Sequence, residues 1–152
     1  MSAYLEQFER VKRFLKRIEN QDRDSTDYDD DLWSFFQNCH HLKDWIKNDP
    51  NIEGAEDEVE EFVKSEEDLK ICRDLAVRSK HLDLWPMPNG FNAEVISRHV
   101  NIYAPVAGSR EVGTSTRECI IALEGRPTRI ALDVAGKAVE AWRKFLSDKY
   151  LI

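Results

Sequence analysis

Apolar side chains recur at helical spacing between residues 32 and 48, and this segment is the most clearly patterned part of the chain. On a helix with 100° per residue they form one stripe: Leu32, Phe35, Phe36, Cys39, Leu42 and Ile46. The polar flank beside that stripe carries Trp33, Gln37, His40 and Asp44, whereas His41 points away from it. The pattern predicts a core helix that also presents the side chains of a possible site.

The same periodicity predicts further helices over about 2–20, 55–64, 65–80 and 133–149. Ser2, Ser65 and Asp133 stand where N-caps are expected, and the acids after Ser65 suit a capping box. The segment 21–31 is rich in Asp and lacks apolar anchors, so it is predicted to be a loop. It lacks the central Gly and the final Glu of a calcium-binding EF-hand loop.

Beyond the prolines and the Asn-Gly pair of residues 85–90, the pattern changes from helical to alternating. Strands are predicted over 94–103, 116–123 and 128–132, with a loop over 104–115 and a hairpin turn over 124–127. The predicted fold class is α+β and helix-dominated. A four-helix bundle over about 2–82 precedes a three-stranded antiparallel sheet over about 94–132 and a C-terminal helix over about 133–149. The sheet is expected to lie on the bundle within a single domain spanning 1–152.

Charge is distributed unevenly over the 152 residues, which carry a formal net charge of −7. Residues 1–70 sum to −10 and residues 71–152 to +3. This distribution argues against broad binding of duplex nucleic acid, which needs many phosphate contacts, and is compatible with head-to-tail association of subunits.

The cysteine content and the hydropathy restrict where the protein is expected to act. Cys39, Cys72 and Cys119 lie far apart in apolar segments, and this spacing favours small buried hydrophobic residues over a disulfide framework. No stretch has the pattern of a signal peptide or the roughly 20 apolar residues of a membrane span. We therefore expect a cytoplasmic protein without a membrane partner.

The polar flank of the 32–48 helix offers the first candidate chemistry. His40 and Asp44 are one turn apart, so the carboxylate could orient the imidazole or share a metal ion with it. His41 lies about 100° further round the helix, and neither an HExxH motif nor a close Cys/His pair is present. We predict no metal and no cofactor, and a structural His–Asp hydrogen bond is the simpler alternative.

The end of the 65–80 helix offers the second candidate. Arg73 and His81 share a helical face with Lys80 near its edge, an arrangement that suits phosphate binding and general acid–base catalysis. Alternatively, Lys80 and His81 simply complement the negative end of the helix dipole. The catalytic candidates of this sequence are His41, Asp44, Lys80 and His81. The binding candidates are His40, Trp33, Arg73 and Lys80.

Two other basic segments could bind anions. Lys12, Arg13, Lys16 and Arg17 crowd one end of the first helix, and the Gly-containing segment 106–117 carries Arg110 and Arg117. A solvated helix face and a surface loop are the corresponding structural interpretations. The chain has no GxSxG motif and no Walker lysine.

Residues 35–45, 72–82 and 141–146 together resemble a family of small bacterial proteins of unknown function, which share HLKDW and DLA-N-x-SKH-type motifs. Val77 stands here where Asn is usual in that family. The resemblance implies an architecture and a set of positions but no activity.

A more distant similarity is to HEPN domains, helical bundles that often cleave RNA through an Arg-x4–6-His motif. The chain places seven residues between Arg73 and His81, and two between Arg78 and His81, so neither pair has that spacing.

From the sequence we expect a non-enzymatic interaction or accessory protein that self-associates or binds a protein partner. The alternative is a HEPN-like domain that acts on nucleic acid or nucleotides through the His/Asp/Lys cluster. The two hypotheses differ in whether His41, Asp44, Lys80 and His81 converge in an accessible cleft. Such a cleft requires the 32–48 and 65–80 helices to lie side by side, with the histidines of the first facing the basic end of the second.

Overall fold

The computed structural model describes residues 2–78, 93–101, 115–149 and 151–152, with side chains left undescribed at 96–101 and 115–116. In this part of the chain the elements follow in this order: α1 (Ala3–Asn20), α2 (Thr26–Lys47), α3 (Ala55–Ser65), α4 (Glu67–Arg78), β1 (Glu94–Asn101), β2 (Ser115–Leu123), β3 (Arg126–Ile130) and α5 (Ala131–Asp148). The prediction of a helix-dominated α+β fold with an antiparallel sheet and a C-terminal helix is confirmed.

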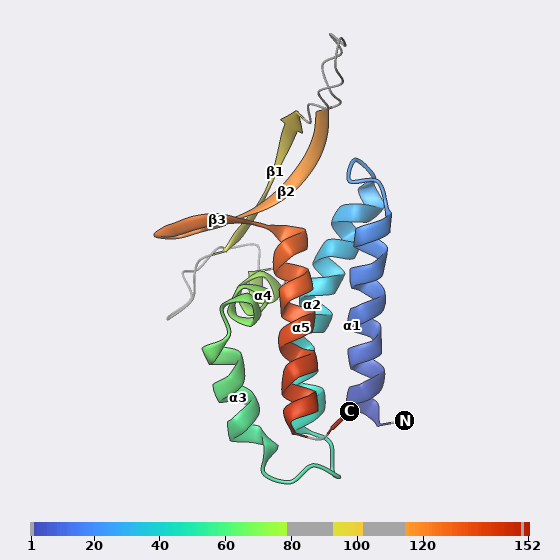
Figure 1. Cartoon of the computed structure of the whole chain (residues 1–152), viewed down its shortest axis with the longest axis vertical. Helices are drawn as coiled ribbons and strands as arrows, with labels where there is room; N and C mark the ends of the chain where they lie inside the picture. The colour runs from blue at the N-terminus through green and yellow to red at the C-terminus, as the bar shows by residue number, and fades with distance from the viewer. Residues whose placement is uncertain (1, 79–92, 102–114, 150) are drawn as a thin grey trace, which may run out of the picture.

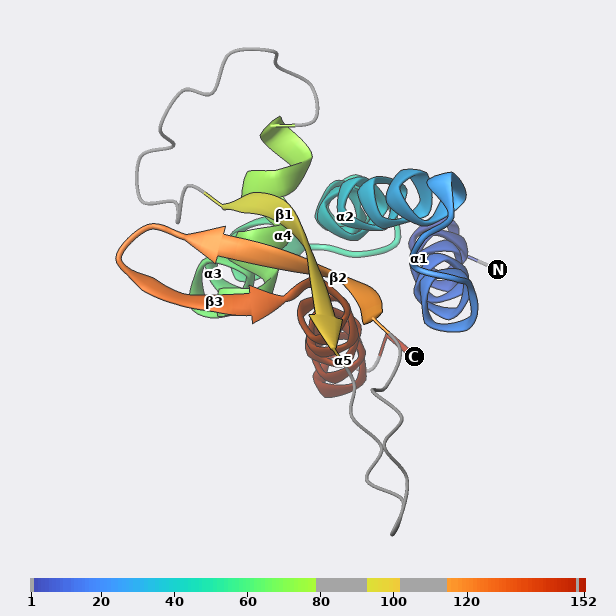
Figure 2. The same cartoon turned by 90° about the horizontal axis from the view of Figure 1, so that it is seen from above.

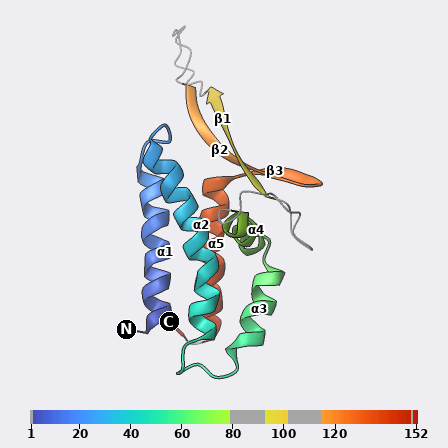
Figure 3. The ribbon, with the colours of Figure 1, turned by 180° about the vertical axis from the view of Figure 1, so that it is seen from behind.

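Three long helices form the body of the molecule, and the sheet crosses one end of it (Figure 1). α1 and α2 are neighbours, and α5 contacts α1, α2 and α4. The C-terminal helix is therefore part of the bundle rather than an addition beside the sheet. α4 crosses the long helices steeply, and α3 lies below it beside the lower part of α5, as the view from behind also shows (Figure 3).

The apolar stripe predicted on α2 is buried along its whole length. Its six residues, Leu32, Phe35, Phe36, Cys39, Leu42 and Ile46, are each no more than 1% exposed. Trp142 of α5 packs over this stripe and donates a buried hydrogen bond of 3.1 Å from its indole nitrogen to the carbonyl oxygen of Cys39. The prediction of a core helix is confirmed, and α5 contributes an aromatic side chain to the same core.

α2 begins six residues earlier than the predicted 32–48 segment, so the loop predicted over 21–31 is wrong from Thr26 onward. Ser25 is the N-cap, and its hydroxyl accepts a hydrogen bond of 3.2 Å from the Asp27 backbone. Asp27 and Asp29 lie in the first turn, where carboxylates stabilise the positive end of the helix. Tyr28 is fully buried, which extends the apolar stripe by one turn.

Two predicted N-caps are also wrong. Ser65 is the last residue of α3, and its hydroxyl donates to the carbonyl oxygen of Phe62. α5 begins directly after β3, with Ile130 at the cap position, so Asp133 lies in the first turn instead. Ser2 is the cap residue of α1, as predicted, but its side chain makes no capping hydrogen bond. The Ser65 cap was predicted wrongly because α3 continues one residue further than expected. The Asp133 cap was predicted wrongly because β3 ends, and α5 begins, two residues earlier than expected.

The sheet has the order β1-β2-β3 with antiparallel pairing throughout. β2 and β3 are joined by the two-residue turn Glu124–Gly125, shorter than predicted, and Gly125 has the positive φ of +68° that this tight connection requires. β3 accordingly runs over 126–130 rather than 128–132. Ile102 and most of the predicted 104–115 loop lie outside the described residues, as do residues 85–90.

Ion pairs attach the sheet to the helices. Arg129 of β3 pairs with Asp68 of α4 at 2.7 Å, and Arg117 of β2 pairs with Asp29 of α2. Figure 2 shows the sheet from above, lying across the helix ends where these contacts form. Beside Arg117, burial raises the pKa of Tyr28 to about 12, and its buried hydroxyl has no hydrogen-bond partner among the described residues. These ion pairs join β2 and β3 to the helices.

Candidate functional site

The predicted site depends on α2 and α4 lying side by side, and they do. Between them lies a hollow of about 140 Å³ lined by His40, His41, Lys43, Asp44, Ala76 and Val77. Two small buried residues of α4, Cys72 and Ala76, permit the close approach of the helices. The edge of α2 that carries the histidines therefore faces the C-terminal part of α4, as expected from the sequence.

His40 is the most perturbed group of this α2–α4 hollow. Burial first, and then the positive charges of Lys43 and its other neighbours, lower the pKa of His40 to about 3. The ring is tilted against that of His41, with 6.1 Å between the centroids. His40 is therefore neutral near pH 7, and with so low a pKa it is a weak general base.

The His40–Asp44 hydrogen bond considered as the structural alternative is not formed among the described residues. The Asp44 side chain is exposed at the C-terminal end of α2. Nearby, Lys43 and Lys47 both pair with Glu60 of α3, at 3.3 and 2.8 Å. The lysines of this helix end are thus engaged by α3, and Asp44 has no ion pair within the described part of the chain.

The other candidates are not brought into the α2–α4 hollow by the described structure. Arg73 pairs with the buried carboxylate of Asp74 at 3.2 Å, and Trp33 packs edge-on against Phe36 with 6.4 Å between ring centroids. Lys80 and His81 lie outside the described residues, so their convergence with His41 and Asp44 stays a prediction. The same applies to Arg110 of the Gly-containing segment.

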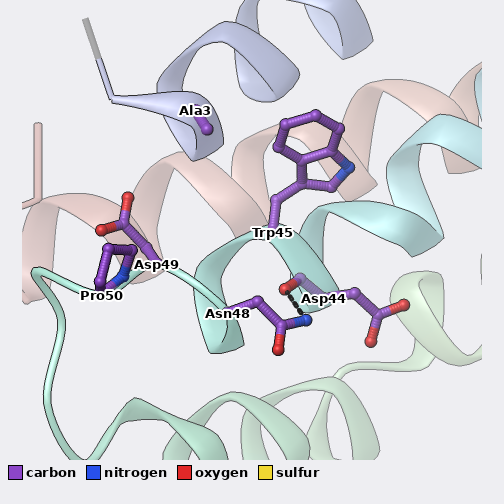
Figure 4. A pocket seen from close by; sticks show the side chains of 6 residues that line it. All are labelled: Ala3, Asp44, Trp45, Asn48, Asp49 and Pro50. Atoms are coloured by element: carbon purple, nitrogen blue, oxygen red, sulfur yellow. Dashed lines mark hydrogen bonds between the residues drawn. The ribbon is translucent and has the colours of Figure 1, made fainter.

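A second hollow, which the sequence did not reveal, lies at the C-terminal end of α2 (Figure 4). It measures about 390 Å³ and is lined by Ala3, Asp44, Trp45, Asn48, Asp49 and Pro50. Trp45 is 40% exposed, whereas Asp49 is buried and accepts a hydrogen bond of 2.8 Å from the Asn51 backbone. Asp44 lines both hollows. The available sequence signal was a tryptophan outside the apolar stripe of its helix.

Metal-ligating side chains do not cluster in the described structure: no three His, Cys, Asp or Glu residues there are placed to hold an ion. Within the same ranges, no helix is both long and apolar enough to cross a bilayer. Comparison with protein-family models, with curated proteins and with solved structures finds no match to this chain. The two family resemblances of the sequence therefore stay predictions.

Proposed function

We propose that this chain is a non-enzymatic interaction protein that binds a partner protein through the Trp45 hollow. The observation that carries the proposal is the exposed indole at the edge of a hollow that also contains two carboxylates. Tryptophan is the residue type most enriched among interface residues that dominate binding energy, especially when it borders a pocket.

The chemistry of the hollow favours a cationic side chain of the partner. Asp44 and Asp49 give it two negative charges, and no lysine or arginine is among the residues that line it. The face of an indole attracts Lys and Arg through its quadrupole, and nearby carboxylates add Coulombic attraction. The expected ligand is therefore a protein segment with an exposed Lys or Arg beside apolar residues, in a different protein or in a second copy.

The test compares wild type with Trp45→Ala. Proteins retained from a cell extract are identified by mass spectrometry, and self-association is followed by sedimentation velocity over a range of concentrations. The segment found is then titrated as a purified peptide against both forms. Loss of the indole should weaken binding by about 2 kcal/mol or more, the range of interface hot spots. Replacing the peptide's Lys or Arg by Gln should weaken it as well.

A matched control is Ile130→Ala, which removes an apolar side chain that is 49% exposed on β3, away from the hollow. It should leave association unchanged. The proposal is wrong if wild type and Trp45→Ala retain the same proteins with the same affinity and self-associate to the same extent.

A second candidate is the nucleic-acid-acting alternative, and the α2–α4 hollow is the observation that favours it. His41 and Asp44 line that hollow beside the neutral His40, as a small polar site requires. Nuclease activity and RNA retention are measured for wild type, His41→Ala and His81→Ala. The candidate requires activity or retention that both substitutions reduce, and inactivity of all three proteins removes it.

A further inference from the structure

The outer face of α1 carries a hollow of about 280 Å³ lined by Arg10, Arg13, Phe14 and Arg17. These positions follow one another at helical spacing, and at 1.5 Å per residue the guanidinium row is about 10 Å long. It is separate from the Trp45 hollow and from the α2–α4 hollow, which share no lining residue with it. An acidic chain thus has a concentrated positive site on its first helix.

Two of the three arginines are held in place by buried partners. Arg10 donates to the side-chain oxygen of Gln7 at 2.6 Å. Gln7 is 1% exposed, and its amide nitrogen in turn donates to the backbone carbonyl of Asn38 in α2 at 3.0 Å. The guanidinium of Arg10 is therefore oriented by the contact between α1 and α2 rather than left to move freely.

Arg17 is fixed at the other end of the row. Its guanidinium reaches both carboxylate oxygens of the buried Asp31, at 3.2 and 2.9 Å, and lies over the ring of Phe14 at 5.6 Å from the centroid. Asp31 offsets one of the three positive charges and leaves two in excess. Arg13 lies between Arg10 and Arg17 in the sequence and is exposed, with no ion pair among the described residues.

This arrangement differs from the anion-binding face considered from the sequence. The ammonium group of Lys12 pairs with Glu9 and lies over the ring of Phe8, 4.9 Å from its centroid. Lys16 does not line the hollow. The cationic groups of the hollow are all guanidinium groups, which are planar and donate forked hydrogen bonds that match phosphate oxygens.

We propose that the α1 hollow binds the phosphate groups of a nucleotide or of a single-stranded nucleic acid. A phosphate concentrates more charge and more acceptor oxygens on one centre than a carboxylate does, which suits guanidinium donors, and a row about 10 Å long offers places for more than one phosphate group. Phe14 adds an apolar wall to the hollow, and the guanidinium of Arg17 that lies over its ring is itself a planar group on which a nucleobase can stack. The proposal goes beyond the proposed protein partner and concerns a different surface.

The experiment measures binding of ATP, inorganic phosphate and a labelled single-stranded oligonucleotide at low ionic strength, by calorimetry and fluorescence anisotropy. Arg13→Gln should weaken the binding of ATP or oligonucleotide about tenfold or more, and Arg10→Gln together with Arg13→Gln should weaken it further. Lys144→Gln removes one exposed charge of α5 outside the hollow and should leave affinity unchanged. Circular dichroism checks that each variant is folded.

The probes also distinguish the source of the phosphate. An oligonucleotide that binds more tightly than ATP, with affinity falling by about 0.7 log unit per contacted phosphate for each log unit of salt, indicates a strand. Equal affinities for ATP and for the oligonucleotide indicate that the ligand is a free nucleotide. The proposal is overturned if no phosphate probe binds, if Arg13→Gln and Lys144→Gln behave alike, or if only an acidic peptide such as polyglutamate binds. Trp45→Ala should leave phosphate binding intact. A failure of the phosphate proposal can therefore be distinguished from a failure of the proposed protein partner.

Discussion

Two tryptophans beside α2 have opposite environments. Trp142 reaches α2 from α5, is 1% exposed, and is enclosed by Phe62 and Phe145 with its indole nitrogen hydrogen-bonded to Cys39. Trp45 belongs to α2 itself and is 40% exposed in a hollow that Asp44 and Asp49 also line. The first side chain stabilises the fold, and the second is available to a partner.

The difference shows that one face of α2 stabilises the fold while another part of the same helix is available for binding. The inner face of α2 carries the apolar stripe, and α2 contacts α1, α4 and α5. Because this core is closely packed, a substitution in the stripe should disturb the packing of all four helices. The outer C-terminal end contacts the solvent through Trp45 and Asp44 and can change without loss of core packing. His40 lies between these two regions and should show an intermediate sensitivity.

The largest expected effect is that of Trp142→Ala. Removing this buried indole leaves a cavity in the α2–α5 contact, and the free energy of unfolding should fall by about 3–5 kcal/mol. Trp142→Phe keeps a ring against Phe145 and should cost less. Urea denaturation followed by circular dichroism measures both. An alanine variant within about 1 kcal/mol of wild type would contradict the assigned role of this side chain.

A smaller effect is expected at His40 when the pH is lowered. Its pKa is about 3 in the folded chain and 6.5 for the free side chain, so between these values only the unfolded state binds the proton. Stability should therefore fall as the pH falls below 6.5, by up to about 1.4 kcal/mol per pH unit from this residue. Denaturation curves between pH 7 and pH 4 for wild type and His40→Gln isolate this contribution. If the free energy of unfolding changes with pH to the same extent in both proteins, burial does not lower the pKa of His40.

The smallest effect on stability is expected for Trp45→Ala. A side chain at the surface that contributes little to the core should change the free energy of unfolding by roughly 0.5 kcal/mol. The same denaturation assay measures it, with Ile130→Ala as the comparison. A loss as large as that of Trp142→Ala would mean that Trp45 supports the fold, and the contrast between the two indoles would not hold.

Most of the fold could be predicted from the sequence because periodicity is a local property. The apolar stripe of α2, the anchors Val59 and Val63 of α3 and the Glu124–Gly125 turn all follow from neighbouring residues. The early start of α2 was missed because a run of aspartates is as suitable for a helix N-terminus as for a loop. Tyr28, four residues before Leu32, was the available signal.

The candidate site was less predictable. The sequence predicted that α2 and α4 meet at the histidines, and they do, but it also included Trp33 and Arg73, which are engaged elsewhere. The hollow beside Trp45 was missed because it forms where the start of α1 approaches the end of α2, residues more than forty positions apart. Lys80 and His81 remain predicted members of the site.

The sequence by itself determined which face of each helix is buried, since that depends on spacing within one element. Only the tertiary structure decided which side chains from different elements meet: Gln7 with Asn38 behind the arginine row, Ala76 beside His40, and Asp68 with Arg129. Such contacts have no local signature, because they depend on how separate helices and strands pack. The shielding that keeps His40 neutral follows from the same packing.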